Sequence, residues 1–215
     1  MNLHKRFVSI RKNLPSEVKL IAVTKNVDVR IINQAAFLGV TDIGESRVSS
    51  ALKKKLSANK NLKWHMIGHL QSNKVKDAVE IFDMIQTVDS FKLAKKIDSV
   101  AASKNKVMAV LVQVNISNDP KKYGLNENEI FPFLKSLSSL KNLKVLGLMT
   151  IILDVSEEDA KPYFSKMKTL FDNIKLFNIP NIDMKYLSMG MSRDFRVAIE
   201  SGSNMVRIGT SLFKD

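Results

Sequence analysis

The stretch Ile21-Ala22-Val23-Thr24-Lys25 decides how the rest of the chain is interpreted. Its apolar run ends abruptly in a lysine, and the polar segment Asn26-Val27-Asp28 follows. This composition predicts a buried strand that ends at Lys25. Two interpretations of Lys25 are open at this point. Either its long side chain extends from the strand end into solvent, or its amine holds a carbonyl cofactor.

Strand-like and helix-like segments alternate with regular spacing outward from this run. The predicted strands cover residues 19–24, 41–43, 62–67, 84–88, 107–116, 144–151, 186–189 and 205–208. The predicted helices cover residues 2–13, 28–38, 45–56, 72–82, 90–103 and 126–139, then a long helix after Ser156 and a short one over 192–201. The residues expected to cap helices are Asp28, Ser72, Ser90, Ser156 and Ser192.

This alternation of β and α units shows no break in composition and no linker. Eight such units predict an α/β fold with a parallel sheet, closed into a (β/α)₈ TIM barrel that forms a single domain over residues 1–215. Little chain follows the last strand, so the additional N-terminal helix is expected to cover the seam. The alternative is an open, doubly wound sheet, which predicts a Gly-rich turn after the first strand. Asn26-Val27-Asp28 has no glycine, which disfavours that alternative.

Composition narrows the class of protein. The chain has 215 residues, 45% of them hydrophobic, and no cysteine, which excludes a disulfide framework, a thiolate zinc site and a cysteine nucleophile. The first fourteen residues lack the continuous apolar core of a signal peptide, and no stretch has the length of a membrane-spanning helix. We therefore expect a cytoplasmic protein that does not bind membranes. The net charge of +13 comes from dispersed lysines without interleaved aromatic residues, so nucleic-acid binding is disfavoured.

Two glycine-containing turns follow the last two predicted strands, Ser188-Met189-Gly190-Met191-Ser192 and Arg207-Ile208-Gly209-Thr210-Ser211. In barrels of this kind, active sites lie at the carboxyl ends of the strands, and the loops after strands seven and eight commonly hold phosphate. Glycines let backbone N–H groups approach an anion, and hydroxyl groups add donors. The first and last strands are neighbours in a closed barrel, so Lys25 converges on these turns. An aldehyde that carries a phosphate fits this arrangement, and pyridoxal phosphate is one.

Nine segments carry a resemblance to a known family. They are IAVTK, DIGESRV, WHMIGHLQSNKVK, QTVDS, VLVQVNIS, YGL, GLMTI, LSMGMSRDF and MVRIGTSLF. In this order, over about residues 19–213, they resemble the pyridoxal phosphate homeostasis protein family. The resemblance implies a fold-type III barrel similar to the N-terminal domain of alanine racemase.

The resemblance also implies roles for individual residues. Lys25 is expected to form the internal aldimine, and Arg207 to reach toward the cofactor. Ser192, Gly209 and Thr210, with the backbone of Gly190 and Met191, are expected to hold the phosphate. Ser46 stands where the family usually has asparagine, and Lys122 matches a position proposed to handle the cofactor outside the main site. The full set of expected cofactor-binding residues is Lys25, Ser46, Met149, Ser188, Gly190, Met191, Ser192, Arg207, Gly209 and Thr210.

Several polar residues have more than one interpretation. His65 and His69 are four residues apart, but a strand is predicted at the first and Gly68 interrupts any helix, so a structural role is favoured over a metal site. His69 is also a candidate for the wall of the cofactor pocket. Asp194 is unfavourable beside a phosphate unless Arg193 offsets its charge or its carboxylate points away.

The sequence therefore predicts a protein that buffers and delivers pyridoxal phosphate, in vitamin B6 and amino-acid homeostasis, without robust turnover. Its expected partners are the cofactor and apo forms of enzymes that need it, and it is expected to act as a monomer. One alternative is an amino-acid racemase or lyase, which needs a second domain to complete its acid–base pair. The other is a basic nucleic-acid-binding protein.

Overall fold

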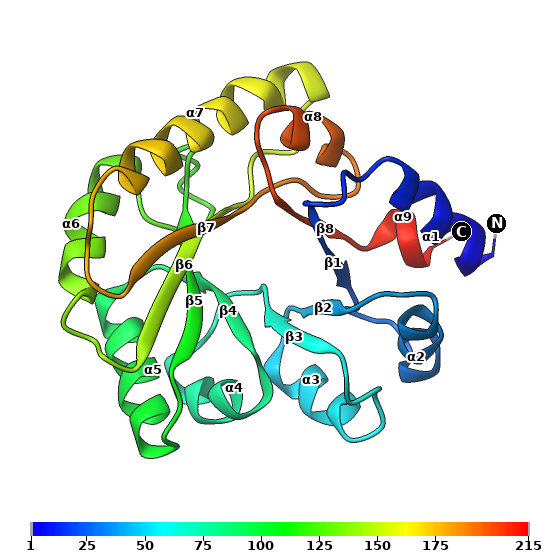
Figure 1. Ribbon diagram of the computed structural model, residues 1–215, viewed down its shortest axis with the longest axis horizontal. Helices are drawn as coiled ribbons and strands as arrows, with labels where there is room; N and C mark the ends of the chain where they lie inside the picture. Colours follow the sequence, from blue (N-terminus) through cyan, green and yellow to red (C-terminus); the bar gives the residue numbers. More distant parts are fainter. Residues whose placement is uncertain (1, 215) are drawn as a thin grey trace.

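The computed structural model describes residues 2–214, and its eight parallel strands close into one barrel (Figure 1). The strands neighbour one another in chain order, and β8 pairs with β1. The helices lie outside the strands, so the predicted (β/α)₈ architecture is confirmed. The strands are β1 (Lys19–Val23), β2 (Asp42–Glu45), β3 (Lys63–Met66), β4 (Met84–Val88), β5 (Met108–Val114), β6 (Leu143–Thr150), β7 (Ile182–Ser188) and β8 (Met205–Ile208).

The helices follow the strands as predicted, with one additional turn after β8. They are α1 (Leu3–Lys12), α2 (Val29–Phe37), α3 (Val48–Lys55), α4 (Val75–Ile81), α5 (Phe91–Ser103), α6 (Glu127–Leu137), α7 (Glu157–Lys175), α8 (Phe195–Glu200) and α9 (Thr210–Phe213), with a 3₁₀ turn, η1, over Ser72–Lys74. Within residues 2–214, no helix is long and apolar enough to cross a membrane.

The predicted caps differ in outcome. Asp28, Ser90 and Ser156 each accept a hydrogen bond from the backbone N–H of a residue in the first turn, as predicted for N-caps. Ser72 begins the 3₁₀ turn instead, and α4 starts only at Val75, so the prediction of a Ser72 cap is wrong. Ser192 does not cap α8 either, because that helix begins at Phe195.

The boundary between β2 and α3 is predicted wrongly around Glu45. Glu45 is the buried last residue of β2, although its residue type is typical of a helix surface. Its carboxylate accepts hydrogen bonds from the Thr24 hydroxyl and from Lys54 Nζ, each at 2.7 Å. These bonds stabilise the end of β1, since Lys54 also donates to the Thr24 carbonyl at 2.8 Å. The residue before Lys25 is therefore held both by its hydroxyl, which donates to Glu45, and by its carbonyl, which accepts from Lys54.

The core has two parts. The larger lies between the strands and the helices, and the smaller fills the inside of the barrel. The inner cluster consists of Ile21, Met84, Leu111, Met149 and Met205. Three of these five residues are methionines, whose flexible side chains can fill an irregular space.

The seam between β8 and β1 is covered by α1 together with α9, which lie side by side (Figure 1). Arg6 Nε on α1 donates a hydrogen bond of 3.0 Å to the Leu212 carbonyl on α9. The expectation that the N-terminal helix covers the seam is thus confirmed, and the short helix α9 after β8 covers it as well.

Gly147 in β6 is where a side chain would disturb the barrel most. Its φ is +137°, and a Cβ there would lie 1.9 Å from the Tyr186 carbonyl oxygen on β7. We expect Gly147→Ala to lower the free energy of unfolding by about 3 kcal/mol or more, because two strand backbones must separate. Gly202→Ala is the matched control. Its φ is also positive, at +94°, but a Cβ there would meet only the flexible Lys168 side chain. Urea unfolding would contradict the account if both variants lost the same stability.

Asp42 is a buried charge near the amino ends of the strands. Burial opposes its ionisation, but hydrogen bonds from His65 and Thr41 and the charge of Lys19 lower the pKa of Asp42 to about 2. Its native pKa lies below the unfolded value, so its contribution is complete above the unfolded pKa and is lost as the pH falls toward about 2. Between about pH 5 and about pH 2, the wild type should lose about 2 kcal/mol more stability than Asp42→Asn. Equal losses in urea titrations of the two proteins would contradict this.

Candidate functional site

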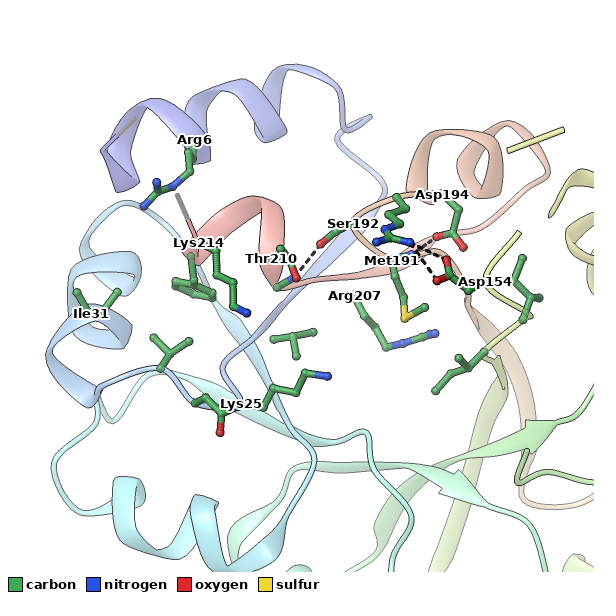
Figure 2. Close-up of a pocket in the computed structure, with 18 of the residues that line it drawn as sticks. Arg6, Lys25, Ile31, Asp154, Met191, Ser192, Asp194, Arg207, Thr210 and Lys214 are labelled. Atoms are coloured by element: carbon green, nitrogen blue, oxygen red, sulfur yellow. Dashed lines mark hydrogen bonds and ion pairs between the residues drawn. The ribbon is translucent and has the colours of Figure 1, made fainter. Parts of the chain in front are cut away.

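A cavity of about 870 Å³ opens at the carboxyl ends of the strands (Figure 2). Segments that follow β1, β6, β7 and β8 form its walls, and α1 and α9 close one side. Of the predicted cofactor-binding residues, the ones that line this cavity are Lys25, Met191, Ser192, Arg207, Gly209 and Thr210. The structure therefore brings together the first strand end and the last two, as the barrel topology predicts.

Lys25 projects into the cavity from the end of β1 (Figure 2). The strand stops there because Asn26 adopts a left-handed backbone conformation with φ of 63°. The Lys25 side chain is exposed, and its Nζ has no hydrogen bond or ion pair among residues 2–214. The site thus presents a free primary amine on a well-fixed backbone.

Ser192 and Thr210 form the polar wall opposite Lys25 (Figure 2). Ser192 Oγ accepts long hydrogen bonds of 3.3 Å from the N–H groups of Gly209 and Ser211, which joins the loop after β7 to the start of α9. This explains why Ser192 does not cap α8. Among residues 2–214, the hydroxyl and N–H groups of Thr210 have no hydrogen-bond partner, so they can serve an anion. A Cβ on Gly209 would lie 3.1 Å from Val23 Cβ, which leaves little room for any other residue.

Arg207 is a buried cation at the floor of the cavity. Only 3% of the residue is exposed, and its guanidinium donates to Ser188 Oγ and to the Thr150 carbonyl, each at 2.7 Å. No carboxylate in the described part of the chain forms an ion pair with it. Burial lowers the pKa of Arg207 to about 10, and the charge of Asp194 opposes that shift. Arg207 therefore stays protonated at neutral pH and is a cation that an anionic ligand can neutralise.

Asp194 points away from the polar wall. Its carboxylate accepts a hydrogen bond from the Met191 N–H at 2.5 Å. Arg193 does not offset Asp194, because it pairs with Asp154 at 2.9 Å on the outer rim. The backbone donor of Met191 that the family resemblance assigns to the phosphate is thus already bound within the loop.

Four of the expected cofactor-binding residues do not line the cavity. Met149 belongs to the apolar cluster inside the barrel, and the Ser188 hydroxyl lies beneath Arg207. Gly190 has φ of +95°, and its carbonyl accepts from the Arg207 N–H at 3.0 Å. Ser46 packs its backbone against Gly68, where a Cβ would lie 2.2 Å from the Ser46 carbonyl oxygen. A direct contact of these four with a cofactor stays a prediction.

Lys122 lines the same cavity as Lys25 rather than a separate one. The neighbouring Tyr123 ring stacks on His69 with 3.9 Å between ring centroids, and this holds the loop after β5 against the loop after β3. His69 is not part of the cavity lining. The position of Lys122 could be anticipated only from the resemblance, because its place in the barrel depends on this long-range stacking.

The histidine in β3, His65, and the one in the loop after it, His69, have different partners. His65 lies inside the barrel with Asp42 at 2.8 Å, whereas His69 lies 3.9 Å from Asp89 and faces Tyr123. No group of three or more histidines and carboxylates in residues 2–214 is arranged to hold a metal ion.

The charges around the cavity favour an anionic ligand. Among the lining residues, Asp154 is neutralised by Arg193, and Asp28 by Arg30 at 3.0 Å. Of the lysines that line the cavity, Lys25, Lys122 and Lys214 have no ion-pair partner among residues 2–214, and Asp194 is the lining carboxylate without one. Together with Arg207 these lysines leave an excess of positive charge, which attracts anions.

Comparison with known proteins agrees with the fold. A family model described as alanine racemase, N-terminal domain, matches residues 1–215. An alanine racemase of Clostridium difficile has a TM-score of 0.82 over 99% of this chain and 56% of its own, at 20% identity, and shares the fold alone. Fold and cavity therefore define a barrel protein of the alanine racemase N-terminal domain class.

More similar proteins specify the family within that class. A pyridoxal phosphate homeostasis protein of Synechocystis is 39% identical over 97% of this chain and 96% of its own length. The human protein of the same name is 37% identical over 94% of this chain and 78% of its own. PipY of Synechococcus elongatus, solved without and with pyridoxal phosphate bound, gives TM-scores of 0.93 and 0.91 at 34% identity, over 99% of this chain and 100% of its own. The chain belongs to the pyridoxal phosphate homeostasis protein family.

Proposed function

We propose that this chain binds pyridoxal phosphate in the cavity and acts as a carrier that stores the cofactor and delivers it to apo-enzymes. The observation that carries the proposal is that one cavity is lined both by the Lys25 amine and by the buried cation Arg207. Neither has a carboxylate partner among residues 2–214. PipY, which shares the fold and is 34% identical in sequence, has been solved with the same cofactor bound, and this supports the choice of ligand.

Each residue has a role that follows from its chemistry. When bound, the cofactor supplies an aldehyde that condenses reversibly with a primary amine. Lys25 supplies that amine, and its Nζ has no hydrogen bond or ion pair among residues 2–214 that would have to break first. Thr210 and Ser192 offer hydroxyl groups to the phosphate, and Arg207 offers a positive charge that is itself buried at the cavity floor.

A carrier is favoured over a racemase by the residues around Lys25. No histidine or tyrosine of the described chain lines the cavity, so no imidazole or phenol is supplied there as a proton-transferring partner for Lys25. Lys122, in the loop after β5, places a second amine on the cavity wall, and we assign it a role in cofactor release. Monomeric action in the cytoplasm stays a prediction, which sedimentation and cell fractionation would test.

Titration of the purified protein with pyridoxal phosphate tests binding, and transfer to an apo-enzyme tests delivery. The expected results are a saturable visible absorption band with one cofactor per chain, and recovery of apo-enzyme activity from the loaded protein. Absence of the band at excess cofactor would refute the proposal. Racemisation of amino acids well above the rate of free cofactor would favour the enzyme instead.

A further inference from the structure

A row of polar side chains runs through the inside of the barrel, from the cavity floor to the amino ends of the strands. Apolar residues surround it, and all of its members except the last are buried. In order from the cavity, the row consists of Arg207, Ser188, Gln86, His65, Asp42 and Lys19. It joins strands β8, β7, β4, β3, β2 and β1.

The first links hold the guanidinium that lines the cavity. Arg207 Nη1 donates to Ser188 Oγ at 2.7 Å, and the Ser188 hydroxyl donates to Gln86 Oε1 at 2.7 Å. Gln86 Nε2 also has the Met205 thioether as an acceptor at 3.3 Å. Arg207 Nη2 has its own acceptor, the Thr150 carbonyl. Two acceptors on two nitrogens fix the plane of a guanidinium, whereas one leaves it free to turn.

The remaining links anchor Gln86 at the far end. Gln86 Nε2 lies 3.1 Å from His65 Nδ1, and His65 Nε2 lies 2.8 Å from Asp42 Oδ1. The other Asp42 oxygen accepts from Lys19 Nζ at 3.0 Å and from the Thr41 hydroxyl at 2.7 Å. The Lys19 side chain is 32% exposed, so the row ends in a carboxylate whose charge is balanced at the surface.

The bonds between the two ends run in one direction, from donor to acceptor. Arg207 can only donate, and an ionised Asp42 can only accept. Between them, Ser188 donates to Gln86 Oε1, and Gln86 presents its amide nitrogen to His65 and to the Met205 thioether. His65 then carries its proton on Nε2 and leaves Nδ1 as an acceptor. Reversal of one link leaves two donors or two acceptors facing each other in a buried site, which is costly.

We propose that Ser188 and Gln86 are positioning residues for Arg207, and that the His65–Asp42 pair fixes their orientation. The row sets the plane in which the Arg207 guanidinium meets the bound cofactor, although none of these four residues lines the cavity. The proposal rests on the proposed function, because it assumes that the cofactor occupies the cavity that Arg207 lines.

Substitution of Gln86 by methionine removes the central link while keeping the volume of the side chain. We expect Gln86→Met to bind pyridoxal phosphate about tenfold more weakly, and to lose much of the visible circular dichroism of the bound cofactor. Ser188→Ala should reproduce both effects with a smaller change of volume. Leu111→Met is the control, since Leu111 is equally buried inside the barrel and belongs to no link.

Substitution of His65 separates positioning from packing. Glutamine can accept from Gln86 and donate to Asp42, so His65→Gln should keep affinity within about twofold, whereas His65→Leu should resemble Gln86→Met. Nitrogen-15 NMR of the unloaded wild type, which has only three histidines, should show His65 protonated on Nε2 alone.

The outcomes distinguish the claim that the protein binds the cofactor from the claim that Ser188 and Gln86 position Arg207. If the wild type does not bind the cofactor, the proposed function fails. If the wild type binds it and the folded Gln86→Met and Ser188→Ala proteins match Leu111→Met in affinity and circular dichroism, the positioning role is wrong. The opposite His65 tautomer in the NMR spectrum would also overturn it, without any variant.

Discussion

Replacement of Lys25 by alanine is expected to abolish covalent attachment of pyridoxal phosphate. Lys25 presents its amine to the cavity with no partner among residues 2–214, and the backbone before it is fixed by Lys54 and Glu45. The purified variant should be colourless, and added cofactor should produce no stable absorption band. The variant should fold as well as the wild type, within about 0.5 kcal/mol, because the side chain is exposed.

Lys122→Ala is the matched control for Lys25→Ala. It removes an amine of the same kind from the same cavity. We expect it to remain yellow and to release the cofactor at a different rate. A yellow Lys25→Ala protein together with a colourless Lys122→Ala protein would contradict the assignment of cofactor attachment to Lys25. Lys122 would then be the residue that attaches the cofactor.

Replacement of Arg207 by methionine should have the second-largest effect. A hydrogen bond to a charged group contributes about 1.5–3 kcal/mol, so the loss of this cation should weaken cofactor binding roughly 10- to 150-fold. Stability of the unloaded protein should change little, within about 1 kcal/mol. The removal of a buried charge without an anionic partner offsets the acceptors left behind at Ser188 and Thr150.

Arg193→Met is the control for the charge effect. Arg193 also lines the cavity, but its side chain is 82% exposed and already paired with Asp154. Titration with the cofactor should show a change of less than about threefold. Equal losses for both arginine variants would mean that overall charge, rather than the buried position of Arg207, determines affinity.

The fold could be predicted from sequence wherever the residues of one segment determine by themselves whether it forms a strand or a helix. β4 and β8 begin and end at the predicted residues, because short apolar runs between polar segments define them. The start of β7 is missed by four residues, since Asp183 and Lys185 are exposed on it and give no apolar run. Glu45 is misassigned because its partner Lys54 is known only after folding.

The site residues also divide into those that local sequence and topology predict and those that depend on distant partners. Lys25, Ser192 and Arg207 stand at strand ends, and the barrel rule alone places them on one cavity. The bond between Asp194 and the Met191 N–H, and the role of Ser188 beneath Arg207, could not be predicted. Ser188 and Gln86 are 102 residues apart, and no local pattern in the sequence reports such a contact.

Reduction of the loaded protein with borohydride, followed by peptide mass mapping, tests the central claim most directly. Reduction makes the link between amine and cofactor permanent, so the mass shift identifies the amine that held it. The account predicts one modified peptide per chain, with the cofactor on Lys25. Modification of Lys122 or of scattered surface lysines, with Lys25 unmodified, would contradict it.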